Sequence, residues 1–178
     1  MKRDRQAEEK IIGVLLDHAG ERLYMSQIAG NAGTAVATTH QILERKAEEN
    51  FLQKEKLGNL SLYSVNPQAP LVKQLKIKRT VERLQPLVER LKEQGQKIIL
   101  FGSAAQGRDT IESDFDFFIL TDQKGEVLKI IQNSKLSRKI KPVVKNFLEW
   151  VEMKEKDKFF YEEIEKGIVL WEEEDERI

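Results

Sequence analysis

Two aspartates, one residue apart, are the side chains of this sequence best suited to chemistry. Asp114 and Asp116 lie at the start of the apolar run Phe115–Leu120, which reads as a buried strand. Side chains alternate along a strand, so both carboxylates should project from one face while Phe115 projects from the other. Neighbouring carboxylates repel each other, and a divalent cation would keep both ionised. The pair therefore predicts a metal site, and Mg²⁺ suits carboxylate and phosphate oxygens best.

A Gly-Ser pair follows the preceding apolar run, Ile98–Phe101. Gly102 at the end of a strand lets the backbone approach a ligand closely. The free amides of a following helical turn, with the hydroxyl of Ser103, would hold phosphate oxygens. Gly107 would end that short turn, and Arg108 adds positive charge next to it. Together with the two aspartates, this segment predicts a site for a phosphate-bearing ligand and a metal.

The order of these residues resembles the signature of the DNA polymerase beta nucleotidyltransferase superfamily, most closely its minimal members from archaea and bacteria. The matching residues are a hydrophobic strand, Gly102, Ser103, Gly107 and the run Ser113–Asp116. The resemblance implies transfer of a nucleotidyl group from a nucleoside triphosphate, ATP in the first instance, to an acceptor hydroxyl. It implies Asp114 and Asp116 as catalytic ligands of two Mg²⁺ ions. The residues that it implies as nucleotide contacts are Gly102, Ser103, Gly107, Arg108 and Ser113.

The resemblance also implies a third metal-binding carboxylate on a later strand, and the strand predicted over residues 139–146 contains none. That segment reads KIKPVVKN and offers Lys141, Pro142 and Lys145 where an aspartate is expected. Glu149 follows it, and we expect this residue to begin a helix rather than to reach the site. Two carboxylates would still hold one metal and a nucleotide. Two functions therefore stay open, an enzyme and a nucleotide-binding regulator or antitoxin-like protein with slow or no transfer.

The N-terminal third carries a different pattern. Helices are expected over residues 7–18, 27–30 and 35–50, with Ser26 and Thr34 as N-caps of the second and third helices. Two extended runs, residues 51–54 and 60–65, flank Gly58 and form a hairpin where a wing belongs. Residues 6–66 therefore resemble the winged helix-turn-helix domains of prokaryotic transcription regulators.

If the third helix enters a major groove, the face opposite Val36, Leu43 and Ala47 should meet the bases. The residues expected to contact DNA are Thr34, Thr38, Gln41 and Arg45 from the helix and Lys54 and Lys56 from the wing. Basic and acidic residues balance in this domain, which is unusual for a DNA-binding protein because phosphate neutralisation drives affinity. Three partners stay open: double-stranded DNA, a second copy of the chain, and a helical toxin-like protein. The last is implied by the resemblance, since minimal family members often act beside such a protein.

A linker separates the two patterns. Residues 67–70 contain two prolines, and a long helix is expected over residues 72–93, kinked or split at Pro86. Strands over residues 98–101, 115–120 and 139–146 and helices over 147–154 and 159–166 follow. We therefore expect an α+β chain with a winged helix-turn-helix domain over residues 1–66 and a nucleotidyltransferase-like domain, a mixed sheet with flanking helices, over residues 71–178.

The amino-acid composition excludes several classes of protein and of site. The chain has 178 residues, 30 basic and 30 acidic, and no cysteine. Without cysteine, disulfides, thiolate zinc sites and thiol catalysis are excluded. No apolar run reaches the length of a membrane span, and the charged start does not read as a signal peptide. We expect a cytoplasmic protein of prokaryotic, archaeal origin that does not bind membranes.

Overall fold

The computed structural model describes residues 2–173 and divides the chain into two compact units. Unit 1 is Met1–Leu75 and unit 2 is Lys76–Ile178. The division falls inside helix α4 (Pro70–Leu91), which begins where the predicted linker ends. Each unit has an apolar core of its own.

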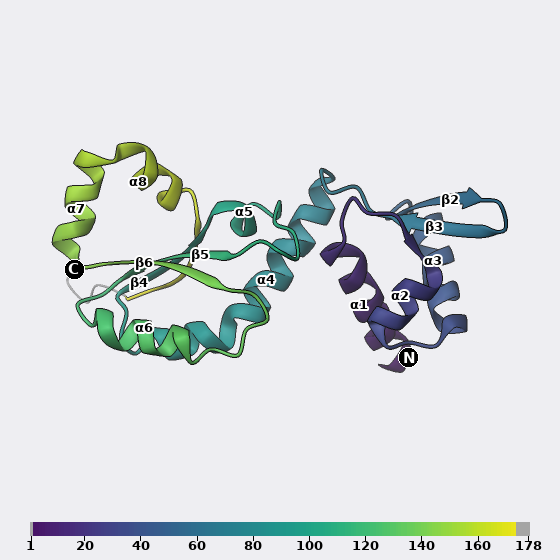
Figure 1. Cartoon of the computed structure of the whole chain (residues 1–178), viewed down its shortest axis with the longest axis horizontal. Coiled ribbons are helices and arrows are strands. Elements are labelled where there is room, and N and C mark those ends of the chain that lie inside the picture. The colour runs from purple at the N-terminus through teal and green to yellow at the C-terminus, as the bar shows by residue number, and fades with distance from the viewer. Residues whose placement is uncertain (1, 174–178) are drawn as a thin grey trace. The chain divides into compact units, whose positions relative to one another are not determined.

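Unit 1 combines three helices with a three-stranded antiparallel sheet (Figure 1). Its elements are α1 (Lys2–Asp17), β1 (Leu23–Tyr24), α2 (Met25–Ala32), α3 (Val36–Glu48), β2 (Gln53–Leu57) and β3 (Leu60–Ser64). Apolar residues at helical spacing, such as Leu15 of α1 and Leu43 of α3, close the core with Tyr63 of β3. The hairpin of β2 and β3 turns at Gly58, whose φ of 60° favours glycine.

The helices of unit 1 do not begin at the predicted caps. Helix α2 begins at Met25, so Ser26 lies inside it, and the side chain of Gln27 accepts a hydrogen bond from the Tyr24 backbone N–H at 2.8 Å. Helix α3 begins after Ala35, and the hydroxyl of Thr34 bonds that of Thr39 at 2.8 Å. Both cap predictions were wrong. Serine and threonine are favoured in several positions near a helix start, and tertiary packing decides which residue the helix begins with.

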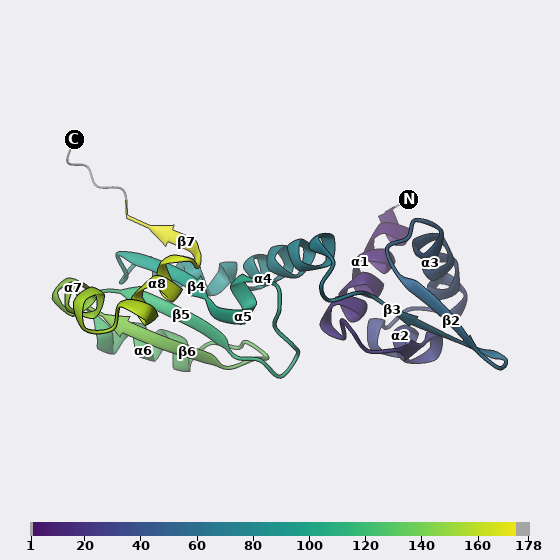
Figure 2. The same ribbon diagram turned by 90° about the horizontal axis from the view of Figure 1, so that it is seen from above.

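Unit 2 is built around a four-stranded mixed sheet with helices on both faces (Figures 1 and 2). After α4 its elements are β4 (Lys97–Phe101), α5 (Gly102–Ala105), β5 (Phe115–Leu120), α6 (Lys124–Gln132), β6 (Ile140–Lys145), α7 (Phe147–Lys156), α8 (Lys158–Glu165) and β7 (Ile168–Glu172). The strand order is β6-β5-β4-β7, and β5 and β6 are parallel while the other pairs are antiparallel. The predicted α+β class with a mixed sheet is confirmed.

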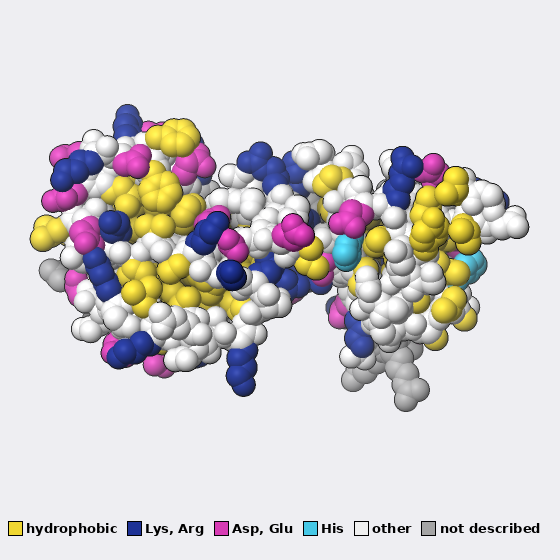
Figure 3. Space-filling view, in the orientation of Figure 1, with side chains coloured by type: hydrophobic (Ala, Val, Ile, Leu, Met, Phe, Trp, Pro, Cys, Tyr) yellow, Lys and Arg dark blue, Asp and Glu magenta, His cyan; other side chains and the backbone are white. Residues whose placement is uncertain are grey.

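Strand alternation gives the sheet two different faces. The strand residues that pack with α4 and α6 are Ile98, Leu100, Phe115, Phe117 and Ile119. Those that pack with α7 and α8 are Ile99, Phe101 and Phe118. In Figure 3 apolar side chains gather over the part of unit 2 where α7 and α8 lie. Asp116 alternates with Phe117, so it lies on the α7 and α8 side of the sheet.

Two helices of unit 2 differ from the prediction. The predicted split at Pro86 was wrong, because α4 is one helix from Pro70 to Leu91 in which the buried Leu84 and Leu87 keep both turns packed; the alternative, a kink at Pro86, stays a prediction. Helix α6 was not predicted, although Val127 and Ile131 are four residues apart and both are buried. Among the helices within residues 2–173, none is both long and apolar enough to cross a membrane.

Candidate functional site

Three neighbouring strands place Phe101, Asp116 and Lys141 in one row across the sheet. Asp116 of β5 is paired with Phe101 of the antiparallel strand β4 and with Lys141 of the parallel strand β6. Paired residues of neighbouring strands project from the same face. The Nζ atom of Lys141 lies 2.9 Å from Oδ2 of Asp114, which directly precedes β5. The two predicted carboxylates therefore lie together on one face, with a lysine beside them.

Gly102 lies directly against the carboxylate of Asp116. Its φ of 70° is in the left-handed region that side chains disfavour. A Cβ atom at this position would also overlap Oδ2 of Asp116. Backbone conformation and space both require glycine here, so α5 can begin immediately next to the aspartate.

The other predicted nucleotide contacts lie in α5 and the loop after it. The backbone N–H of Arg108 donates to the carbonyl oxygen of Ser103 at 2.9 Å, and Gly107 has a φ of 62°, so the chain turns tightly here. The side chain of Arg108 is exposed. The hydroxyl oxygen of Ser113 accepts a hydrogen bond from the backbone N–H of Thr110 at 2.8 Å. Ser113 therefore shapes the turn before the aspartates, a role that its motif position alone did not indicate.

The two aspartates have opposite electrostatic surroundings. The hydrogen bond from Lys141 lowers the pKa of Asp114, and the charge of Lys141 adds to this effect. Burial raises the pKa of Asp116, the charge of Lys141 partly offsets this, and the neighbouring charge of Asp114 raises the pKa further. The same hydrogen bond raises the pKa of Lys141. Lys141 acts on both carboxylates, and Lys139 and Arg138 add positive charge near Asp114, so a bound cation would take the place of Lys141 rather than fill an empty negative site.

The donor set fits one Mg²⁺ ion. Asp114 and Asp116 supply hard oxygen atoms, and phosphate oxygens and water would complete an octahedron. Within residues 2–173, no group of three His, Cys, Asp or Glu side chains is arranged to hold a metal. Lys141 stands opposite Asp116 on β6, where the resemblance implies a third carboxylate. Since 69% of its side chain is exposed, Lys141 can turn away from Asp114. The implied arrangement with two metal ions is not matched by these residues.

Glu149 does not supply the missing carboxylate. Its side chain accepts a hydrogen bond from the backbone N–H of Asn146 at 2.9 Å and bonds with Lys124 through both oxygens at 2.5 and 2.6 Å. The side chain of Asn146 in turn accepts from the backbone N–H of Glu149 at 2.9 Å. The prediction that Glu149 opens a helix is confirmed by this capping box.

We expect Asp116→Asn to raise the melting temperature at neutral pH. Folding raises the pKa of Asp116, so its ionisation destabilises the folded protein at any pH above the pKa in the folded state. This destabilisation disappears as the pH falls below the pKa of the same group in the unfolded chain. Asparagine keeps the shape without the charge, and its advantage should vanish near about pH 4. Calorimetry across this range measures the effect. The control, Asp114→Asn, should lower the melting temperature at neutral pH, because folding lowers the pKa of Asp114. An Asp116→Asn protein that melts below the parent at neutral pH would contradict the expectation.

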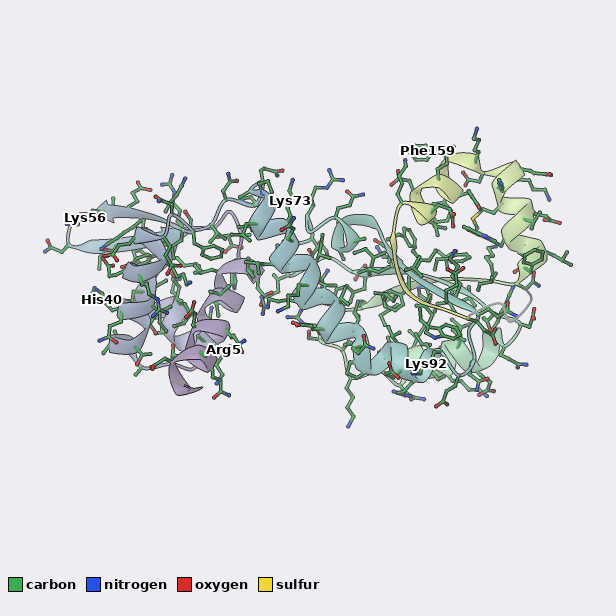
Figure 4. All side chains as sticks on the ribbon, turned by 180° about the vertical axis from the view of Figure 1, so that it is seen from behind. Arg5, His40, Lys56, Lys73, Lys92 and Phe159 are labelled. Carbon is green, nitrogen blue, oxygen red and sulfur yellow. The ribbon has the colours of Figure 1, made fainter. Side chains whose placement is uncertain are left out.

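Helix α3 of unit 1 turns a different face inward than predicted. Val36 was expected to be buried but is 53% exposed, whereas Thr39, Ile42 and Leu43 are buried. The prediction for Val36 was wrong because packing in the core, not the hydrophobicity of one residue, sets the rotation of a helix. His40, which was not predicted as a contact, lies on the exposed face next to Gln41 (Figure 4).

The predicted DNA contacts have different surroundings. Gln41 is exposed, and Lys56 projects from the end of the hairpin (Figure 4). The guanidinium of Arg45 lies 2.6 Å from Glu8, and Nζ of Lys54 bonds both oxygens of Glu44 at 2.6 and 2.7 Å. Thr34 bonds Thr39, and Thr38 is half-buried. Gln41 and Lys56 are therefore placed most openly for a ligand.

Comparisons with known proteins add independent information on unit 2. The sequence model of the family "Polymerase beta, Nucleotidyltransferase" matches residues 82–176, just over half of the chain. A solved structure of a candidate nucleotidyltransferase from Sulfolobus solfataricus is similar over 56% of this chain and 86% of its own, with 14% identity and a TM-score of 0.38. Among curated proteins, none matches the chain. The matched residues include Gly102, Asp114, Asp116 and Lys141, and the chain belongs to the polymerase beta nucleotidyltransferase family.

Proposed function

We propose that unit 2 binds a nucleoside triphosphate and transfers its nucleotidyl group slowly to an acceptor hydroxyl. The observation that carries the proposal is the carboxylate pair on one sheet face, with Asp116 against Gly102 and Lys141 beside Asp114. Membership of the family supports the class of reaction. ATP is the first nucleotide to test, and the other three nucleotides would give the base preference.

The residues have separate roles in this proposal. Asp114 and Asp116 would hold one Mg²⁺, which supplies positive charge to the phosphates when bound. The turn that begins at Gly102 and Ser103 would hold the triphosphate, and Arg108 would add charge at its edge. The acceptor hydroxyl oxygen would form a bond to the α-phosphorus as the bond to pyrophosphate breaks, and the hydroxyl proton would pass to water. Lys141 offers a single point charge and cannot hold a second metal, so we expect the transfer to be slow.

Calorimetric titration with a nonhydrolysable ATP analogue tests the binding step. We expect the analogue to bind in the presence of Mg²⁺. In EDTA its affinity should be lower by a factor of about ten or more, because no cation then relieves the repulsion between the carboxylates and the triphosphate. Asp116→Asn should remove the difference between the two conditions. An analogue that does not bind with Mg²⁺, or that binds equally well to both proteins in both conditions, would remove the proposal.

We propose that unit 1 is a winged helix-turn-helix domain that binds double-stranded DNA and takes part in transcription regulation. Three helices followed by a hairpin whose first strand, β2, is exposed support this function, with α3 as the helix that would enter the major groove. Gln41 would contact bases, and Lys56 would contact phosphates. Arg45 and Lys54 would have to leave Glu8 and Glu44 to do the same.

We expect Lys56→Ala to weaken binding to all duplexes and to lower the salt slope of the affinity by about one. Gln41→Ala should instead change which sequences a random duplex library yields, since a base contact carries sequence information. Arg45→Ala should weaken binding less than Lys56→Ala because its guanidinium is paired with Glu8. Gel shifts at several salt concentrations measure all three variants, with Arg5→Ala on α1 as the control. If the three variants bind as the parent does, this face is not the DNA interface.

Lys141 favours a second candidate, a regulator that senses a nucleotide without transferring it. In this case the DNA affinity of the whole chain should change when the ATP analogue is added, and no label should pass to any acceptor. Nucleotide binding without transfer, together with such a change in DNA affinity, would select the regulator over the enzyme.

A further inference from the structure

A buried cluster of charged side chains holds the loop that leads to Asp114. Its members are Lys76 of α4, Asp109 of the loop between α5 and β5, and Arg138 of the segment before β6. Their side chains are 9%, 6% and 8% exposed. Charged groups buried to this extent destabilise a protein unless their partners are well placed. The cluster is therefore a specific structure and not a chance surface contact.

Arg138 donates hydrogen bonds in three directions. Its Nη1 donates to Oδ2 of Asp109 at 2.6 Å, its Nε to the carbonyl oxygen of Ser113 at 2.5 Å, and its Nη2 to that of Asp114 at 3.4 Å. The guanidinium also lies over the ring of Phe115, with Cζ 4.0 Å from the ring centroid. One planar side chain thus contacts three consecutive residues at the point where β5 begins.

Asp109 is held from the opposite side by α4. The Nζ atom of Lys76 donates to the backbone oxygen of Asp109 and lies 3.5 Å from its Oδ1. Among the described residues, this Oδ1 atom accepts no hydrogen bond within the usual distance. Asp109 therefore links two buried cations, one from the helix and one from the segment before β6. Movement of any of the three would shift the loop.

We propose that Arg138 is a positioning residue for the nucleotide site, with Asp109 and Lys76 holding it in place. By fixing the carbonyl groups of Ser113 and Asp114, it sets the direction in which the carboxylate of Asp114 leaves the backbone. The inference rests on the proposed function, because the aspartate that it positions is a ligand of the proposed site. An arginine is required, since its planar group reaches three acceptors at once, while a lysine would reach one at this place.

Arg138→Lys tests the proposal while keeping the positive charge. In the nucleotide-free protein, site-resolved amide hydrogen exchange should show faster exchange at Ser113 and Phe115, whose N–H groups donate to Thr110 and Lys139. The exchange rates of the most slowly exchanging backbone amides of β4 should change little. Affinity for the Mg²⁺–ATP analogue should fall about tenfold, the effect of disturbing residues that orient a metal ligand. Arg90→Lys, an exposed arginine of α4, is the matched control and should alter neither measurement.

The outcomes separate this inference from the proposed function. If Arg138→Lys is folded and Ser113 and Phe115 exchange as in the parent, Arg138 is not a positioning residue. If faster exchange there accompanies the loss of affinity, the inference is supported. If the parent itself binds no analogue, the proposed function fails, and the exchange of Ser113 and Phe115 still decides whether Arg138 fixes the loop. Should Arg138→Lys not fold, Asp109→Asn is measured in the same way with the same expectation.

Discussion

The double variant Asp114→Asn, Asp116→Asn should lose incorporation of label from an α-labelled nucleoside triphosphate. Both carboxylates lie on one face of the sheet, and that of Asp116 lies against Gly102, where a metal and a phosphate chain would meet. Asparagine keeps the size of each side chain but removes the charge that binds the metal. Removing one group that stabilises charge in a transition state costs a factor of about 10² to 10³, so loss of both carboxylates should lower transfer by about 10³. Radiolabel transfer to cellular protein and RNA acceptors measures the change.

The control for this variant is Asp122→Asn. Asp122 is an exposed aspartate just beyond the opposite end of the same strand. It should retain the parent's rate, since it lies outside the row formed by Phe101, Asp116 and Lys141. Labelling that survives loss of both site aspartates at the parent's rate would show that this site does not perform the transfer.

Lys141→Asp should increase transfer by about tenfold to a hundredfold, the range over which metal sites respond to changes in their surroundings. The substitution places a third carboxylate on β6 opposite Asp116, where Lys141 now bonds Asp114. Three carboxylates can bind two metal ions, which stabilise both the attacking and the leaving oxygen. Initial rates over a range of Mg²⁺ concentrations measure the gain.

Lys141→Asp should also change the stability of the protein. Without metal, three neighbouring carboxylates repel one another, so Lys141→Asp should melt below the parent in EDTA and recover when Mg²⁺ is added. Lys145→Asp, on the same strand and the same face, is the matched control and should show neither the gain in rate nor the recovery. A Lys141→Asp protein with the parent's rate and no stabilisation by Mg²⁺ would show that Lys141 does not occupy a metal position.

Much of the site could be predicted from the sequence because its signals are local. Alternation along Phe115–Leu120 places Asp114 and Asp116 on one side, and a glycine before a short turn marks the close approach of Gly102. Both features depend on residues a few positions apart. The strands that carry them were predicted within one residue of their observed bounds.

The partners of these residues could not be predicted, because they depend on pairing between distant segments. Lys141 meets Asp114 only through the parallel register of β5 and β6, and a shift of one residue would turn it to the other face. Arg138 and Asp109 are 29 residues apart, and nothing in the local sequence pairs them. The capping errors at Ser26 and Thr34 have a related cause, since the core decides where each helix starts.

A crystal structure with Mg²⁺ and a nonhydrolysable nucleoside triphosphate tests the central claim most directly. We expect one metal ion between Asp114 and Asp116, the triphosphate against Gly102 and Ser103, and the side chain of Lys141 turned from Asp114 toward a phosphate. A triphosphate bound elsewhere on the chain, or one bound here with no metal on either aspartate, would contradict the account.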